Sequence, residues 1–170
     1  YVRNHPKELQ KSIVIESEQL PWENETLPLE NTNVEVGETL SIVDPALISS
    51  GLENEWLNSK NYEGRWIRKS GRRPLFIQSK KLIGDGGNYS LISESGMIRS
   101  IIEHNIDNGV EPLIEIGKKL ELKKLTLRLK ISPELQPNLQ SKLDRNLIDF
   151  GGVGFVVELP NNKLAICTKI

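Results

Sequence analysis

The pattern that most constrains this chain is a strict alternation of side chains between residues 124 and 131. Every second residue is apolar and the others are polar or basic, as the segment reads KLTLRLKI. Successive side chains of a strand point to opposite faces of its sheet, so a period of two predicts a strand with one buried face and one basic face. We therefore expect a sheet with other elements covering its apolar side.

Turn residues divide the chain into further strands. The segment 70–74, SGRRP, separates residues 62–69 from residues 75–82, and both flanking segments have a composition typical of strands. The tripeptide Pro-Asn-Asn separates residues 154–159 from residues 163–170 in the same way. Both arrangements predict β-hairpins, in which antiparallel strands are joined by a short turn.

Two segments have the spacing of helices. Ser95 is a suitable N-cap, Gly109 is a suitable residue beyond the C-terminus, and isoleucines between them at positions 98, 101, 102 and 106 share one face. A second helix is predicted to begin near Pro137 and to end before Gly151, with leucines at positions 139, 143 and 147. Residues 112–116 are expected to form a short strand.

The predicted fold class is α+β, with a largely antiparallel sheet of hairpins or a meander and two main helices packed on it. This single domain is expected to span residues 33–170. Residues 1–32 are predicted to form an N-terminal lead and an acidic extended arm, because residues 17–32 contain two prolines and no apolar period.

The net charge of −1 conceals a segregation of charge along the chain. Residues 12–59 include ten acidic residues and no lysine or arginine. Residues 60–130 include 15 basic and eight acidic residues. Many such blocks are only solvated surface, but the contrast directs attention to the basic part of the chain.

We predict from this contrast a non-catalytic domain that binds nucleic acid or another polyanion through a basic sheet face. Lysine and arginine neutralise phosphates, and arginine binds anions with a forked geometry. Tyr62, Trp66 and Phe76 could stack on nucleobases, but the better interpretation places them in the core. The predicted binding residues are Arg65, Arg68, Lys69, Arg72, Arg73, Lys80, Lys81, Lys124, Arg128 and Lys130.

The alternative hypothesis is a module for protein–protein interaction or structural assembly. The acidic arm would then contact a neighbouring subunit, or a protein partner, and the charges would orient the contact. Trp22 would anchor it, since aromatic residues often dominate the binding energy of an interface. The predicted partner-binding residues are Trp22, Glu23 and Glu25.

Motifs for catalysis, cofactors and metals are sparse. One cysteine and two histidines cannot form a Cys/His-rich zinc site, and neither glycine cluster has the strand–loop–helix order of a phosphate loop. A metal-dependent nuclease, with Asp107 or Glu115 beside Glu121 and Lys123, is a third hypothesis based on a pattern expected by chance. We predict no catalytic residue, no cofactor and no metal.

The sequence also limits the cellular compartments in which we expect the protein. It contains nothing close to the roughly 20 consecutive apolar residues that a membrane-spanning helix needs. Cys167 is the only cysteine, which excludes an internal disulfide and favours a reducing compartment. We expect a cytoplasmic protein that does not associate with membranes.

Overall fold

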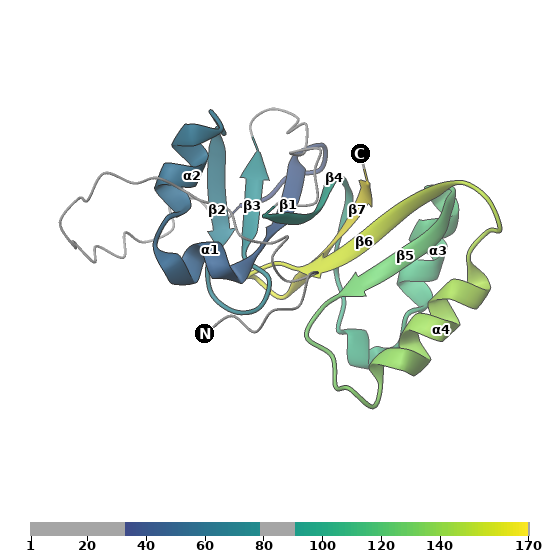
Figure 1. Cartoon of the computed structure of the whole chain (residues 1–170). Helices are drawn as coiled ribbons and strands as arrows, with labels where there is room; N and C mark the ends of the chain where they lie inside the picture. The colour runs from purple at the N-terminus through teal and green to yellow at the C-terminus, as the bar shows by residue number, and fades with distance from the viewer. Residues whose placement is uncertain (1–32, 79–90, 170) are drawn as a thin grey trace, which may run out of the picture. The chain divides into compact units, whose positions relative to one another are not determined.

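The computed structural model describes residues 33–78 and 91–169 (Figure 1). In chain order its elements are β1 (Thr39–Val43), α1 (Pro45–Ser50), α2 (Glu53–Ser59), β2 (Gly64–Arg68), β3 (Leu75–Gln78), β4 (Ile92–Glu103), the 3-10 helix η2 (Ile106–Asn108), α3 (Glu111–Lys119), β5 (Leu122–Arg128), α4 (Gln136–Asn146), β6 (Gly152–Glu158) and β7 (Lys163–Lys169).

The strands form a seven-stranded mixed sheet in the order β2-β3-β1-β4-β7-β6-β5, and the described residues also form four α-helices. β5 and β6 run parallel to each other. The β2–β3, β4–β7 and β6–β7 pairs are antiparallel. The predicted fold class, a largely antiparallel sheet with two helices, is therefore wrong. Parallel strands need a crossover connection, which the periodicity of single segments does not reveal.

The predicted helix that begins at Ser95 is also wrong, because this segment belongs to β4. From Gly96 to Glu103 the strand pairs with β7. Isoleucine is β-branched, and it favours a strand where a neighbouring strand is available for pairing. Only Ile106–Asn108 of the predicted helix is helical, as a single 3-10 turn.

Residues 112–116, which were expected to form a strand, lie within α3. Pro112 occupies the first turn of this helix, where its missing N–H group removes no helical hydrogen bond. Leu113 and Ile114 are buried on the inner face of the helix. The short apolar run was therefore part of an amphipathic helix.

Other sequence predictions are confirmed. β5 has the predicted alternation, with Leu125 and Leu127 buried and Lys124 exposed. The two hairpins form as the antiparallel pairs β2–β3 and β6–β7. The helix predicted near Pro137 is α4, with proline in its first turn.

The chain divides into two compact units. Of the described residues, the first unit contains those from Ser41 to Glu94, and the second contains residues 33–40 and those from Ser95 onward. The predicted domain boundary at residue 32 lies at the edge of the described residues and stays a prediction. No helix within the described ranges has the length and apolar character needed to cross a bilayer.

The first unit contains α1, α2, β2 and β3 around an aromatic core. Trp66 is 8% exposed and Phe76 is fully buried, and their ring centroids lie 5.0 Å apart. Trp56 of α2 packs edge-on against Tyr62, also at 5.0 Å. The interpretation of Trp66 and Phe76 as core residues is confirmed, and Tyr62 is partly buried against the same core cluster.

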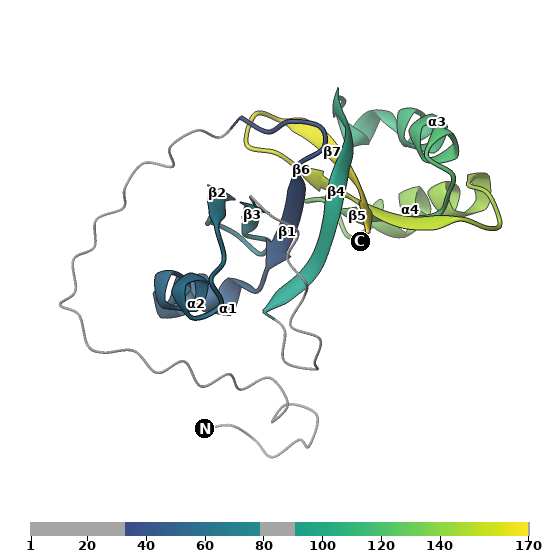
Figure 2. The ribbon, with the colours of Figure 1, turned by 90° about the horizontal axis from the view of Figure 1, so that it is seen from above.

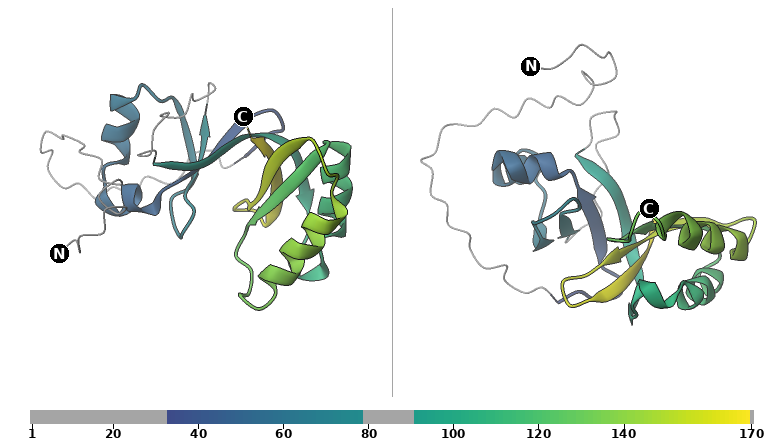
Figure 3. Two further views of the ribbon diagram at one scale, coloured as in Figure 1. Left: turned by 45° about the vertical axis from the view of Figure 1, so that its right-hand side comes forward. Right: turned by 90° about the horizontal axis from the view of Figure 1, so that it is seen from below.

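In the second unit, α3 and α4 lie side by side on one face of the β5–β6–β7 part of the sheet (Figure 2). Leu113 of α3 and Leu143 of α4 pack with Leu125, Leu127 and Val156 in one core cluster. Figure 3 shows α4 running alongside β5, which is the last strand in the sheet order. Since α4 connects the parallel strands β5 and β6, their carboxyl ends lie at the same end of the sheet.

Candidate functional site

The carboxyl ends of β5 and β6 border a hollow of about 440 Å³ in the second unit. In open sheets with parallel strands, ligands bind preferentially outside these carboxyl ends, where the connecting segments diverge. The volume lies within the usual range of small-molecule sites. The hollow is lined by Glu103, His104, Asn105, Ile106, Asp107, Leu129, Lys130, Glu158, Asn162 and Leu164.

Five elements, namely β4, η2, β5, β6 and β7, bring these residues together. Glu103 ends β4, and Asp107 lies in the 3-10 turn that follows it. Lys130 follows the end of β5, whereas Glu158 is the last residue of β6. Asn162 occupies the turn before β7 with a positive φ of 60°, a conformation that asparagine tolerates better than most residues.

The hollow carries more negative than positive charge. Glu103, Asp107 and Glu158 supply three carboxylates, and Lys130 is the one lysine or arginine in the lining, which also contains His104. Lys163 forms an ion pair of 3.1 Å with Glu103, but these side chains are 38% and 79% exposed, so the pair is weak. Even with Lys163 included, acidic groups outnumber basic groups around the hollow.

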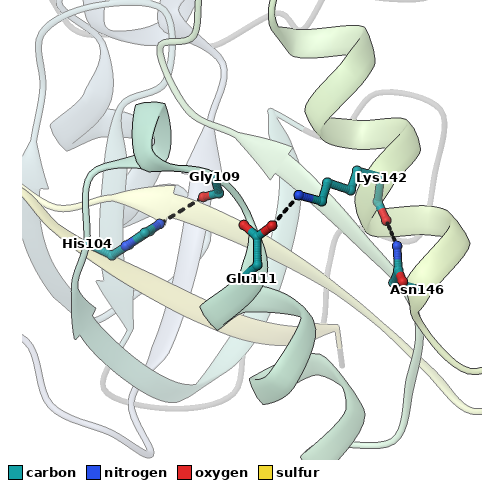
Figure 4. A network of polar contacts seen from close by, with 5 residues as sticks. All are labelled: His104, Gly109, Glu111, Lys142 and Asn146. Atoms are coloured by element: carbon teal, nitrogen blue, oxygen red, sulfur yellow. Dashed lines mark hydrogen bonds and ion pairs between the residues drawn. The ribbon is translucent and has the colours of Figure 1, made fainter.

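His104 has a fixed orientation. Its Nε2 atom lies 2.8 Å from the carbonyl oxygen of Gly109 (Figure 4). A carbonyl oxygen can only accept a hydrogen bond, so Nε2 must carry the proton and donate it. In the neutral ring the Nδ1 atom is then a hydrogen-bond acceptor.

The segment between His104 and Gly109 is held by local hydrogen bonds. Asn105 caps the 3-10 turn, since its Oδ1 accepts a hydrogen bond of 2.9 Å from the N–H of Asp107. The N–H groups of Asn108 and Gly109 donate to the carbonyls of Asn105 and Ile106, both at 3.0 Å. This side of the hollow is therefore well defined before a ligand binds.

An ion pair joins the two helices of this unit. The Nζ atom of Lys142 in α4 contacts Oε1 of Glu111 at the start of α3, and the Lys142 carbonyl accepts a hydrogen bond of 2.7 Å from Asn146 (Figure 4). The hydrogen bond from Lys142, aided by backbone N–H groups at the start of α3, lowers the pKa of Glu111 below its usual value of 4.5. The pair is exposed and contributes only modestly, so α3 and α4 are held together mainly by their shared core residues, among them Leu113 and Leu143.

A second hollow, of about 390 Å³, lies beside β5 and α4. It collects Lys124 and Arg128, two of the predicted binding residues, together with Lys169 of β7. Lys130, predicted to belong to the same basic face, lines the first hollow instead. The second hollow is lined by Lys124, Thr126, Leu127, Arg128, Gln136, Gln140, Asp144, Val153 and Lys169.

The predicted arginines and lysine of the β2–β3 hairpin lie in the first unit, and some have structural contacts. Arg68 donates to the carbonyl of Arg73 at 3.2 Å across the hairpin turn. Lys69 forms an ion pair of 2.9 Å with Glu53 and lies 5.8 Å from the ring centroid of Trp66. The binding role of these side chains, and of Arg65 and Arg72, stays a prediction.

Several predicted residues fall outside the described part of the chain. They are Lys80, Lys81, Trp22, Glu23 and Glu25. That nucleic acid or a protein partner binds at these positions also stays a prediction.

Of the residues that line the first hollow, sequence reasoning predicted only Lys130 as a binding residue, and as part of a basic sheet face. The segment that contains His104 was predicted to be helical, and Asp107 was considered only for a nuclease, because the strand β4 and the parallel pairing of β6 were not predicted. The signal that could have found them is the position of Lys130 and Glu158 just where two apolar strands end. Within residues 33–78 and 91–169, no group of three or more His, Cys, Asp or Glu side chains is arranged to hold a metal ion.

No protein-family model and no curated protein sequence matches the chain. Among solved structures, a provisionally assigned methyltransferase from Porphyromonas gingivalis W83 is similar, with a TM-score of 0.46 and 11% identity over 93% of this chain. TrmN from Thermus thermophilus is similar with a TM-score of 0.43 and 11% identity over 78% of this chain. The chain spans only 36% and 45% of those two chains, and at such scores the likeness does not assign an activity.

The predicted function is corrected. The basic residues near Arg72 and those near Arg128 belong to different compact units. The structure therefore does not support the single basic sheet face that we predicted. The prediction of a nucleic-acid or polyanion binding domain is therefore wrong, and so are its assembly and nuclease alternatives.

Proposed function

We propose that the second unit binds a small organic cation in the hollow at the carboxyl ends of β5 and β6. The observation that carries this proposal is that three acidic residues, Glu103, Asp107 and Glu158, line one hollow that contains a single lysine. An amine that approaches these carboxylates would make charge-assisted hydrogen bonds, which are stronger than those between neutral groups.

The remaining lining supports the same class of ligand. Because Nε2 of His104 donates to Gly109, Nδ1 is the ring atom that can accept a hydrogen bond when the ring carries one proton, and Asn162 has an amide oxygen that can do the same. Ile106, Leu129 and Leu164 provide apolar surface for a short hydrocarbon chain. A flexible diamine, with charged ends and an apolar middle, has the chemistry that such a lining recognises.

The test uses putrescine and 1,4-butanediol, which have the same carbon chain with charged or neutral ends. Isothermal titration calorimetry should show saturable binding of putrescine and much weaker binding of the diol. Asp107→Asn and Glu158→Gln should each raise the Kd for putrescine about tenfold, because a hydrogen bond to a charged group contributes roughly 1.5–3 kcal/mol.

Glu115→Gln is the matched control, since Glu115 is an exposed acid of α3 outside the hollow. It removes the same charge and should leave the Kd unchanged. Equal affinity for the diamine and the diol, or equal effects of all three substitutions, would contradict the proposal.

We also propose a cytoplasmic, reducing location. Its support is that Cys167, the only cysteine, is fully buried in β7 and cannot form an internal disulfide. Fractionation of the native cells, followed by thiol labelling of the unfolded protein, should find the protein in the cytoplasmic fraction with a reduced thiol. Recovery in another fraction would contradict this location.

A further inference from the structure

The second hollow has the opposite electrostatic character from the first. Lys124 and Arg128 come from β5, and Lys169 comes from the end of β7. Asp144 is the one acidic residue of the lining, and it accepts a hydrogen bond of 2.9 Å from Gln140. Three basic residues and one acidic residue therefore line this hollow.

The sheet places these basic groups together. Lys124, Thr126 and Arg128 alternate with leucines that pack in the core with α3 and α4, so they project from the other face of β5. Thr126 of β5 is aligned with Phe155 of β6, and Phe155 is aligned with Cys167 of β7. Lys169, two residues beyond Cys167, consequently lies on the same face as Arg128 and Lys124.

The beginning of α4 adds a favourable field. Gln136, its first residue, lines the hollow, and no side chain caps the helix at Leu135. The N-terminus of a helix carries a partial positive charge that stabilises anions. Gln136 and Thr126 can also donate hydrogen bonds to an oxyanion.

We propose that this hollow is a binding site for a compact phosphorylated small molecule, separate from the organic cation assigned to the first hollow. The volume of about 390 Å³ suits a sugar phosphate, and the basic groups surround a single space instead of forming an extended track. Lys124, Arg128 and Lys169 would bind the phosphate, with Gln136 and Thr126 as hydrogen-bond donors.

The test compares ribose 5-phosphate, ribose, inorganic phosphate and a single-stranded oligothymidylate by calorimetry or by NMR shift perturbation at constant ionic strength. The expected result is saturable binding of ribose 5-phosphate, with shifts in β5 and at the start of α4, and no saturable binding of ribose. Inorganic phosphate should bind at the same residues and more weakly. Binding of the oligomer alone, or binding without shifts in β5, would overturn the proposal.

Substitutions distinguish binding at this hollow from a general effect of the protein's charge. Lys124→Gln and Lys169→Gln should each raise the Kd for ribose 5-phosphate about tenfold, the effect of losing one hydrogen bond to a charged group. Lys118→Gln removes the same charge from the last turn of α3, outside the hollow, and should change the Kd less than twofold. All of these side chains are exposed, and the thermal unfolding midpoint of each variant verifies that it is folded. Equal weakening by the three variants would also overturn the proposal.

Discussion

Gln140 binds the backbone of Leu127 from outside the sheet, in the place where a neighbouring strand would bind it. Its Oε1 accepts a hydrogen bond of 3.0 Å from the N–H of Leu127, and its Nε2 donates to the carbonyl of Leu125, also at 3.0 Å. β5 is the last strand in the sheet order, so part of its backbone would otherwise lack partners. One side chain of α4 thus protects the strand edge, which could otherwise pair with another chain.

We expect Gln140→Leu to destabilise the protein by about 1–3 kcal/mol, because it leaves both backbone groups of β5 without this partner. Urea unfolding followed by circular dichroism measures the change. Gln136→Leu, the same substitution in the first turn of the same helix, should change the stability by less than about 0.5 kcal/mol. Equal losses in the two variants would mean that the edge contact contributes nothing specific.

The start of β6 depends on a glycine. Gly151 has a φ of 122°, and an added Cβ would fall on the carbonyl oxygen of Glu121. That same oxygen accepts the N–H of Gly152 at 2.9 Å, where the parallel strands β5 and β6 begin. Gly151→Ala is therefore expected to cost about 3 kcal/mol or more, from backbone strain and the clash together.

Gly51→Ala provides the comparison. Gly51 ends α1 with a φ of 70°, and an added Cβ there would meet no atom within 4 Å. Only the left-handed backbone is unfavourable, at a cost of about 1–2 kcal/mol. Denaturant unfolding of both variants should therefore give the larger loss for Gly151→Ala, and the reverse order would refute this account of the turn.

The Glu111–Lys142 pair predicts a dependence on pH. The pKa of Glu111 lies below its usual 4.5 in the folded protein, chiefly because of the hydrogen bond from Lys142. The pair therefore stabilises the fold above pH 4.5, and this contribution is lost as the pH falls through the lower folded-state pKa. NMR titration should show the Glu111 pKa rising toward 4.5 in Lys142→Gln and staying unchanged in Lys118→Gln. An unchanged pKa in Lys142→Gln would exclude the ion pair as its cause.

Local sequence patterns correctly predicted those elements in which the local preference of the segment and its tertiary contacts favour the same secondary structure. The alternation around Leu125 and Leu127 and the proline at the start of α4 were sufficient for β5 and α4. In β4, by contrast, isoleucines at positions 98, 101 and 102 satisfy a helical spacing, and pairing with β7 made the segment a strand. The neighbour that decided the structure lies far away in the sequence, so a local pattern cannot contain it.

Local sequence patterns predict the residues of the candidate sites even less well than they predict the strands and helices. Lys124 and Arg128 were predicted to lie on one face of a strand, and the structure brings them to one hollow. Lys169 joins them only because β7 runs two strands away from β5 in the sheet, an order that the sequence does not display. The position of Glu158 near His104 likewise follows from β7, because Leu164 is aligned with Glu158 of β6 on one side and with Ile102 of β4 on the other.

The place of β7 in the sheet has a consequence for biosynthesis. β7 is the latest strand in the sequence, yet it lies between β4 and β6 and pairs with both. While the chain emerges from the ribosome, β4 and β6 have no strand to join them until residues up to Lys169 have been made. The sheet can therefore be completed only after β7 has been made. Premature termination within residues 163–169 would leave the edges of β4 and β6 unpaired, and chaperones or proteases would recognise such a chain.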